Sequence, residues 1–342
     1  MEQSAAHRAG AGALSGPVGE TPALAASLLR LVRPAQWSKS AFVLLGPVYA
    51  AAEGKPVDWP GVLGAVLAIT LASSSAYVVN DIHDRRGDLA HPRKRNRPVA
   101  AGAVTVAQAR TLVVALLLGA LGALFLVGTG PAADARAWGW PARPLVALTV
   151  VLYLANTTAY SIWLKHVAIV DVMSLAAGFV LRVLAGCAAA GVSPSTWLLN
   201  CTLFLAMFLA FGKRLGERRT LAALDADSGS GVTAARARRV HLHYTDELLR
   251  MAVVVTAVAT LITYAGYVQA REAAWTVGMN LLWLTVLPPT YAMFRCILLL
   301  ERGRYDDPTE LAARDRPFQV AAAAFVVLTA GLMLFFRRSG GG

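Results

Sequence analysis

The chain has 342 residues, of which 56% are hydrophobic and only 15% are charged, and its mean hydropathy is +0.54. Soluble proteins carry about 25% charged residues, so this composition excludes an ordinary soluble domain. The formal net charge of +12 would suggest nucleic acid as the partner of a soluble protein. In so apolar a chain the distribution of the charge matters more than its total, and we expect membrane lipids as partners and no nucleic acid.

The first 25 residues are rich in Ala, Gly and Ser and lack a continuous apolar core, so we predict that residues 1–30 form a disordered leader. Apolar stretches follow, each long enough to cross a hydrocarbon core of ~30 Å as a helix. No long polar segment separates them, so residues 31–337 are expected to form one all-α domain, a polytopic bundle of about nine transmembrane helices. The predicted spans are 37–54, 61–82, 104–127, 143–161, 167–187, 196–213, 250–270, 277–300 and 317–336.

Lys and Arg residues are distributed unevenly between the connections. If the N-terminus is inside the cell, most of the 32 lie in cytoplasmic segments, chiefly 83–103, 214–249 and 301–316. Cytoplasmic connections of membrane proteins carry an excess of such residues. We therefore predict a multi-pass plasma-membrane protein whose working face is cytoplasmic. The exceptions are Arg182 within a span and, outside, Lys55, Arg136, Arg143, Arg271, Arg337 and Arg338.

An acidic cluster marks the cytoplasmic end of the second span, within YVVNDIHDRRGDLAHPRKRNRPVAAG at 77–102. On a continuous helix, five side chains of this segment share about 100° of one face: Tyr77, Asn80, Asp81, Asp84 and Asp88. Three carboxylates so close repel one another unless a cation lies among them, and Mg²⁺ prefers such oxygen ligands. Basic residues follow directly and suit phosphate, so the segment favours a Mg²⁺–diphosphate site. The alternative is a juxtamembrane loop with solvated Asp residues and Lys and Arg residues on anionic lipid.

The motif Asn-Asp-x-x-Asp-x-x-x-Asp at 80–88, followed by His91-Pro92-x-Lys94-x-x-Arg97-Pro98, resembles the first aspartate-rich motif of the UbiA-type intramembrane prenyltransferases. The resemblance implies a nine-helix bundle around a cytoplasm-facing cavity that binds Mg²⁺ and a diphosphate. It implies catalytic roles for Asp81, Asp84 and Asp88, and metal binding by Asn80, Asp84 and Asp88. Asn80 and Asp84 are the preferred ligands, because one helical turn separates them.

Other segments are similar to one branch of that family, the decaprenyl-phosphate phosphoribosyltransferases. They are Arg33-Pro-x-Gln36-Trp37-x-Lys39, Tyr160-Ser161-x-x-Leu164-Lys165-His166, Gly178-Phe-Val-Leu-Arg182 after Asp171, Gly212-Lys213-Arg214-x-x-Glu217 and Tyr305-Asp-Asp-Pro308. Ser40 departs from the branch, where Asn is expected. This resemblance implies transfer of the 5-phosphoribosyl group of phosphoribosyl diphosphate to a polyprenyl (decaprenyl) phosphate, with release of diphosphate, in cell-wall arabinan precursor synthesis.

These substrates bring more negative charge than a prenyl diphosphate and a phenol would, so the site needs cations. Lys213 and Arg214 stand where aromatic prenyltransferases carry a second Asp-x-x-x-Asp motif. They could instead anchor a helix end at the membrane interface. Arg182 pairs either with another helix or with the lipid phosphate. We assign substrate binding to Lys39, Tyr77, Lys94, Arg97, Tyr160, Lys165, Arg182, Lys213 and Arg214.

Two other functions are considered. An aromatic prenyltransferase using polyprenyl diphosphate needs a second aspartate pair early in 214–249, but Asp225 and Asp227 have the wrong spacing. A transporter needs acidic residues in the middle of its spans. Asp171, near a helix end, is the best that this chain offers. The sequence leaves the oligomeric state open, a homo-oligomer included.

Overall fold

The computed structural model describes residues 24–89, 94–130, 139–228, 244–271, 275–276, 278–303, 311–312 and 314–339. His91, Pro92 and the segment 305–308, which contribute to the resemblance above, lie outside the described residues, as do residues 1–23 of the predicted leader.

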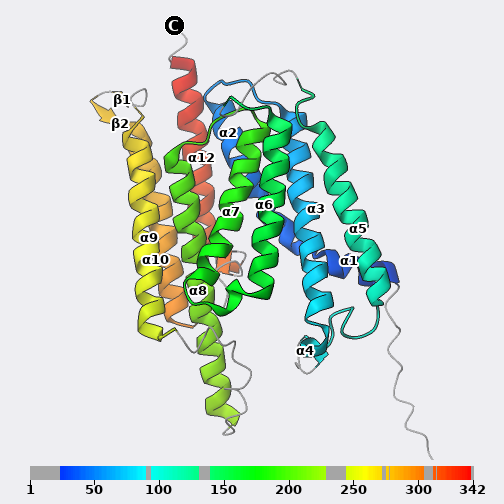
Figure 1. Cartoon of the computed structure of the whole chain (residues 1–342). Helices are drawn as coiled ribbons and strands as arrows, with labels where there is room; N and C mark the ends of the chain where they lie inside the picture. The colour runs from blue at the N-terminus through cyan, green and yellow to red at the C-terminus, as the bar shows by residue number, and fades with distance from the viewer. Residues whose placement is uncertain are drawn as a thin grey trace, which may run out of the picture.

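The described chain is almost entirely helical (Figure 1). Its elements are α1 (Leu24–Val32), the 3₁₀ helix η1 (Pro34–Leu44), α2 (Leu45–Ala52), α3 (Trp59–His83), α4 (Arg85–Leu89), α5 (Val106–Ala123), η2 (Leu124–Leu126), α6 (Ala142–Ile162), η3 (Leu164–His166), α7 (Val170–Ala189), α8 (Thr196–Ser228), α9 (Asp246–Gln269), β1 (Trp275–Thr276), β2 (Met279–Asn280), η6 (Leu281–Val286), α10 (Leu287–Glu301) and α12 (Arg316–Ser339). The two short strands pair antiparallel, with Trp275 opposite Asn280.

Among the described residues, eight helical segments are long and apolar enough to cross a membrane. They correspond to the second to ninth predicted spans, and the all-α multi-pass architecture is confirmed. The first predicted span, 37–54, instead folds as η1 followed by the short helix α2. Pro34 begins η1 and Pro47 lies inside α2, and proline supplies no backbone N–H to a continuing helical ladder.

The segment η1–α2 packs closely on α7. A Cβ atom added at Gly186 would lie 1.7 Å from the Val43 carbonyl oxygen, so only glycine permits this approach. The segment therefore belongs to the bundle, although it is not one continuous helix.

Helix α1 begins inside the segment predicted as a disordered leader, so that prediction is wrong for residues 24–30. Leu24, Leu28 and Leu31 recur at helical spacing and give this helix an apolar face. Leu31 is fully buried, and Leu28 packs against the same cluster as Val78 of α3.

Side-chain oxygens cap the first turns of several long helices, α3, α5 and α9 among them. Asp58 accepts a hydrogen bond from the Gly61 amide at the start of α3, and Thr245 accepts one from the Leu248 amide at the start of α9. Thr105 and Gln108 form a reciprocal capping box at the start of α5. These contacts satisfy amide groups that a helix leaves unpaired in its first turn.

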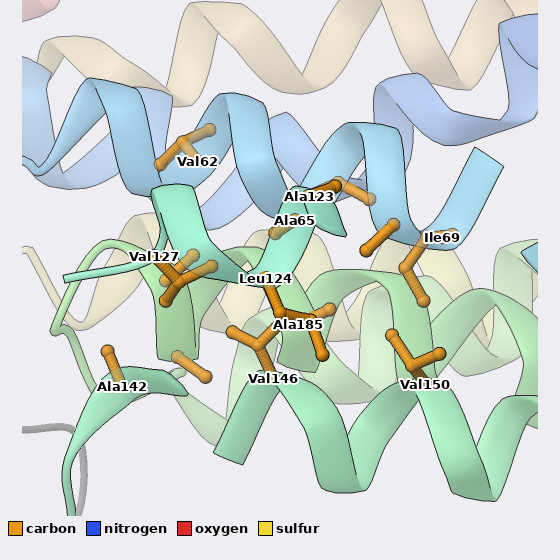
Figure 2. Close-up of a cluster of buried hydrophobic side chains, with 14 of the residues drawn as sticks. Val62, Ala65, Ile69, Ala123, Leu124, Val127, Ala142, Val146, Val150 and Ala185 are labelled. Carbon is orange, nitrogen blue, oxygen red and sulfur yellow. The ribbon is translucent and has the colours of Figure 1, made fainter. Parts of the chain in front are cut away.

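The two largest apolar cores of the described residues meet on α7. One lies between α3, α5, α6 and α7 and contains Ile69, Val146 and Ala185 (Figure 2). The other lies between α7, α8, α9 and α10 and contains Phe211 and Leu299. Because α7 contributes to both cores, it joins the two halves of the bundle.

Polar connections gather at the two ends of the bundle. Figure 1 shows α4 and the C-terminal part of α8 at one end, and the β1–β2 hairpin and the C-terminus at the other. We call the first the basic end and define it by α4, residues 94–104, η3 and the C-terminal part of α8. The opposite end comprises the hairpin and residues 53–58 and 190–195.

Lys and Arg asymmetry predicts that the basic end faces the cytoplasm. An Arg95→Cys variant should therefore resist a membrane-impermeant maleimide in intact cells and react after permeabilisation. Trp140→Cys, exposed near the opposite end, should react in both conditions, and the parent chain provides the background from its own buried or half-buried cysteines. External labelling of Arg95→Cys in intact cells, with Trp140→Cys reacting only after permeabilisation, would reverse the orientation.

Candidate active site

Asn80 and Asp84 form a polar pair where α3 ends. The Asn80 Nδ2 group donates to Asp84 Oδ2 at 3.0 Å, across one helical turn. Lys165 of η3 brings its Nζ atom to 3.8 Å from Asp84 Oδ1. The Asp84 side chain is 31% exposed, so it remains accessible to a ligand. The structure thus brings together the two preferred metal ligands and one predicted cation.

Asp81 and Asp88 form a second, buried pair held by arginines. Arg97 Nη1 donates to Asp81 Oδ1 at 3.1 Å and to Asp88 Oδ2 at 2.8 Å. Arg33 Nη2 donates to Asp81 Oδ1 at 2.6 Å. The Asp81 and Asp88 side chains are only 3% and 5% exposed. The predicted acidic stripe is therefore divided: Asp88 lies with Asp81 and the arginines, while Asp84 lies with Asn80.

Arg33 adopts a left-handed backbone conformation, with φ of 56°, between α1 and η1. Such a conformation costs of order 1–3 kcal/mol in a residue other than glycine and persists only where neighbouring contacts impose it. Here the guanidinium contacts Asp81 and also lies over the Tyr77 ring, 5.0 Å from its centroid. These two contacts account for the backbone turn and place Tyr77 beside the acidic cluster.

Arg214 of α8 is the centre of a buried network that ties three segments together. Its Nε atom donates to Asp171 Oδ2 at 2.9 Å, its Nη1 atom to Glu217 at 2.7 Å and its Nη2 atom to the Tyr160 hydroxyl at 3.0 Å. The side chains of Arg214 and Asp171 are 2% and 0% exposed. Arg214 therefore links α8 to α7 and α6, and three of its five N–H groups donate to protein acceptors.

Tyr244 completes this network from the segment before α9. Its hydroxyl donates to Asp171 Oδ1 at 2.7 Å and accepts from the Ile169 amide at 2.6 Å. Burial and the bond to Asp171 raise the pKa of Tyr244 well above its ordinary value, so the hydroxyl stays protonated and donates. Lys213, the neighbour of Arg214, is exposed on a different side of α8.

Arg182 lies deeper in the bundle, on α7, and is 5% exposed. Its Nη2 atom donates to the Tyr153 hydroxyl at 2.8 Å and to Ser73 Oγ at 3.3 Å, and its Nη1 atom donates to the Gly178 carbonyl at 2.9 Å. Its Nε atom is buried and has no hydrogen-bond partner among the described residues. No ion pair of Arg182 with a described carboxylate is found, so its surroundings are neutral.

Lys39 and Lys94, the remaining predicted substrate residues, are half-buried. Lys39 lies in η1, the helix that begins beside Arg33, and Lys94 lies three residues before Arg97. Both therefore belong to segments that supply a cation to the acidic cluster.

The polar groups of Asn80 and Asp84 fit a Mg²⁺ ion that also binds a substrate. Among the described residues, no group of three or more His, Cys, Asp or Glu side chains forms a metal site by itself. Mg²⁺ does not require one, because it usually binds one or two carboxylates, several waters and substrate phosphates. One carboxylate, one amide oxygen and a nearby lysine suit a metal held together with a diphosphate.

Comparison with known proteins gives the family. The UbiA prenyltransferase family profile matches residues 40–318. The chain belongs to the UbiA prenyltransferase family. "Decaprenyl-phosphate phosphoribosyltransferase" of Mycobacterium tuberculosis is 31% identical over 91% of this UbiA chain and 96% of its own length. The protein of the same name from Corynebacterium glutamicum is 30% identical over 89% of this chain and 85% of its own length.

A solved structure of a UbiA homologue from Archaeoglobus fulgidus, bound to GPP and Mg²⁺, has the same fold. It matches with a TM-score of 0.60 and 17% sequence identity, over 90% of this chain and 99% of its own. This likeness confirms the UbiA fold for the bundle described above.

Three residues of the site were not assigned from the sequence. Arg33 was noted only as part of a matching segment, although its position before a proline-led helix could have drawn attention to it. Tyr244 gave no signal, because single tyrosines near helix ends are common in membrane proteins, and Tyr153 gave none because it lies in the middle of an apolar span.

Proposed function

We propose that this UbiA family member transfers the 5-phosphoribosyl group of phosphoribosyl diphosphate to a polyprenyl phosphate, releasing diphosphate. The proposal rests first on the relatives named decaprenyl-phosphate phosphoribosyltransferase, which are similar over nearly the whole chain. Decaprenyl phosphate is accordingly the proposed acceptor. We propose that the reaction occurs on the cytoplasmic side of the plasma membrane, at the basic end of the bundle. Its lipid product would supply cell-wall arabinan synthesis.

The observation that carries the choice of reaction is the balance of charge at the site. Where an aromatic prenyltransferase needs a second metal-binding carboxylate pair, α8 presents the exposed Lys213 next to Arg214, whose charge is already neutralised by Asp171 and Glu217. Arg33, Arg97 and Lys165 contribute further cations around the acidic cluster. A site so rich in cations suits a donor with three phosphate groups and an acceptor that is itself a phosphate.

Asn80 and Asp84 would hold Mg²⁺ in this reaction, and Asp81 and Asp88 would keep the arginines in position. A bound Mg²⁺ neutralises the charge that develops on the leaving diphosphate. Lys165, beside Asp84, would bind an oxygen of the same diphosphate. Attack of an acceptor phosphate oxygen on ribose C1 forms the new C–O bond while the bond from C1 to diphosphate breaks. The acceptor is already ionised at neutral pH, so none of these residues needs to remove a proton.

Arg182 would bind the phosphate of the lipid acceptor. It is a buried cation in a membrane span with no described carboxylate partner, an arrangement that is costly unless a partner or a wet cavity is present. Tyr153 and Ser73 orient its guanidinium from α6 and α3.

The direct test is an assay of purified protein with Mg²⁺, labelled phosphoribosyl diphosphate and decaprenyl phosphate. We expect a labelled lipid that requires all three, with diphosphate as the second product. A parallel reaction supplies polyprenyl diphosphate and 4-hydroxybenzoate. A prenylated aromatic product in that reaction, with no phosphoribosylated lipid in the first, would favour the aromatic prenyltransferase.

Replacement of Arg182 tests the acceptor site separately. In Arg182→Gln, the KM for the lipid phosphate should rise about 10- to 100-fold, because one charge-assisted contact is worth roughly 1.5–3 kcal/mol. The KM for phosphoribosyl diphosphate should stay within about twofold, and Arg182→Lys should recover part of the loss. Equal changes in both KM values would place Arg182 outside the acceptor site.

A further inference from the structure

A cavity of about 270 Å³ lies at the opposite end of the bundle from the candidate active site. It is bounded by the ends of α2 and α9, the end of α7 and the start of α8, and Tyr49, Glu53, Lys55, Tyr267 and Arg271 line it. Small-molecule sites usually measure ~300–1,000 Å³, so this cavity is sized for a small group rather than for a whole lipid. None of these side chains takes part in the reaction proposed above.

The lining carries more positive than negative charge. Lys55 Nζ lies 2.8 Å from Glu53, and Arg271 forms an ion pair with the other oxygen of the same carboxylate. Burial alone would raise the pKa of Glu53, but the hydrogen bonds and charges of Lys55 and Arg271 outweigh it and hold that pKa below its ordinary value. Glu53 is thus ionised and, as the only carboxylate among the lining residues, leaves one positive charge in excess.

Aromatic rings and an unpaired hydroxyl form one wall. The Arg271 guanidinium lies over the Tyr267 ring, 4.8 Å from its centroid, and the Tyr267 ring contacts those of Tyr49 and Tyr264. The Tyr267 hydroxyl is buried and has no hydrogen-bond partner of acceptable geometry among the described residues. An unpaired buried hydroxyl costs free energy, and an oxygen of a ligand would satisfy it.

The start of α8 forms another wall. Ser195, Trp197 and Leu198 line the cavity, and Ser195 Oγ accepts from the Leu198 amide at 3.1 Å. The first turn of a long helix presents amide groups without helical acceptors and the positive end of the helix dipole. Together with the surplus cation and the unpaired hydroxyl, this wall favours an anion with several oxygen atoms.

We propose that this cavity binds a phosphate group, separately from the catalytic reaction. Arg271 and Lys55 supply charge, Tyr267 supplies a hydroxyl donor and the start of α8 supplies its dipole. Lys55 is 59% exposed in its side chain and Trp197 is 37% exposed, so the cavity opens to the surface. The phosphate can belong to the headgroup of an anionic phospholipid in the facing leaflet or to free inorganic phosphate, since both present the same oxygens.

The test measures binding to purified full-length protein in detergent without Mg²⁺, by native mass spectrometry and thermal shift. The probes are phosphatidylglycerol, phosphatidylcholine and inorganic phosphate. We expect Arg271→Gln to weaken binding of whichever probe the parent protein binds, phosphatidylglycerol or inorganic phosphate, at least tenfold. Glu53→Gln should strengthen that binding severalfold, because it removes the competing carboxylate. Preference for phosphatidylglycerol over phosphatidylcholine, with no response to inorganic phosphate, would identify a lipid headgroup. Binding of inorganic phosphate, with no preference for phosphatidylglycerol over phosphatidylcholine, would identify a free anion.

Two control variants locate the effect. Arg143→Gln removes another arginine that lies over an aromatic ring outside the cavity, and Asp84→Asn alters the candidate active site. Both should retain wild-type binding at the cavity. If the Glu53–Arg271 pair were only structural, Arg271→Gln and Glu53→Gln would lower thermal stability alike and leave probe binding unchanged. That result, or no binding of phosphatidylglycerol and of phosphate to the parent chain, would overturn the proposal.

Discussion

The Asp84→Asn variant should lose turnover by at least 10³-fold, a loss of more than about 4 kcal/mol of transition-state stabilisation, while remaining folded. Asp84 is the exposed carboxylate of the polar pair with Asn80, and its replacement by an amide removes the anionic oxygen that would hold Mg²⁺. Activity of the parent protein should likewise vanish in EDTA and return with added Mg²⁺. The measurement is kcat per folded molecule, with the folded fraction taken from gel filtration and thermal unfolding.

Asp246→Asn is the matched control, since Asp246 is an exposed, ion-paired carboxylate outside the acidic cluster. It should retain nearly full activity. Asp88→Asn should behave differently again, because it removes the partner of a half-buried arginine and should lower stability as well as activity. Full activity of Asp84→Asn in metal-depleted buffer would exclude the metal role for this carboxylate.

Arg214→Ala should destabilise the protein by about 3–5 kcal/mol, because it leaves Asp171 as a buried carboxylate without its cation. Thermal unfolding in detergent, followed by the loss of helical circular dichroism, measures this effect. A combined Arg214→Met and Asp171→Leu variant should recover part of the lost stability, since a buried ion pair is often replaceable by apolar residues of similar volume. Unchanged stability of Arg214→Ala would mean that the buried network is not what holds α6, α7 and α8 together.

Lys213→Ala provides the contrast within the same pair of residues. Lys213 is exposed, so its replacement should leave stability nearly unchanged. If Lys213 binds a substrate phosphate, kcat/KM should fall by about one to two decades, the equivalent of roughly 1.5–3 kcal/mol. An interfacial anchor would leave kcat/KM of the folded protein unaltered for both substrates. Of the two residues predicted to bind phosphate, Arg214 is thus expected to affect stability and Lys213 to affect kcat/KM.

Residue spacing correctly predicted the features that are set by residues close together in the sequence. Eight membrane spans follow from runs of apolar residues, and the Asn80–Asp84 contact follows from one turn of helix. The first predicted span, 37–54, is not among those eight, because it folds as η1 and α2 and hydropathy does not register how Pro47 interrupts the α-helical hydrogen-bond ladder. Helix α1 was missed because its nine residues, with four leucines, are too few to form an apolar run of membrane-spanning length.

Contacts between distant segments could not be read from spacing. Arg33 and Asp81 are 48 positions apart, and the packing of α1 and η1 on α3 brings them together. Lys213 and Arg214 were treated as equivalent, but adjacent helical residues point about 100° apart. Packing against α7 then decides which of the two is buried with Asp171.

The depth of Arg182 has a consequence for how water is kept from reacting. Ser73, which contacts Arg182, and Asn80 are about two turns apart on α3, or roughly 10 Å at 1.5 Å per residue. If diphosphate is held at one end of this interval and the acceptor phosphate at the other, ribose C1 lies between them. A water molecule carries no anionic group to engage Arg182, so hydrolysis would forgo the stabilisation that transfer receives. The ratio of transfer to hydrolysis would then depend on this buried cation. In Arg182→Gln, a larger share of the phosphoribosyl diphosphate would be hydrolysed to free ribose 5-phosphate and diphosphate.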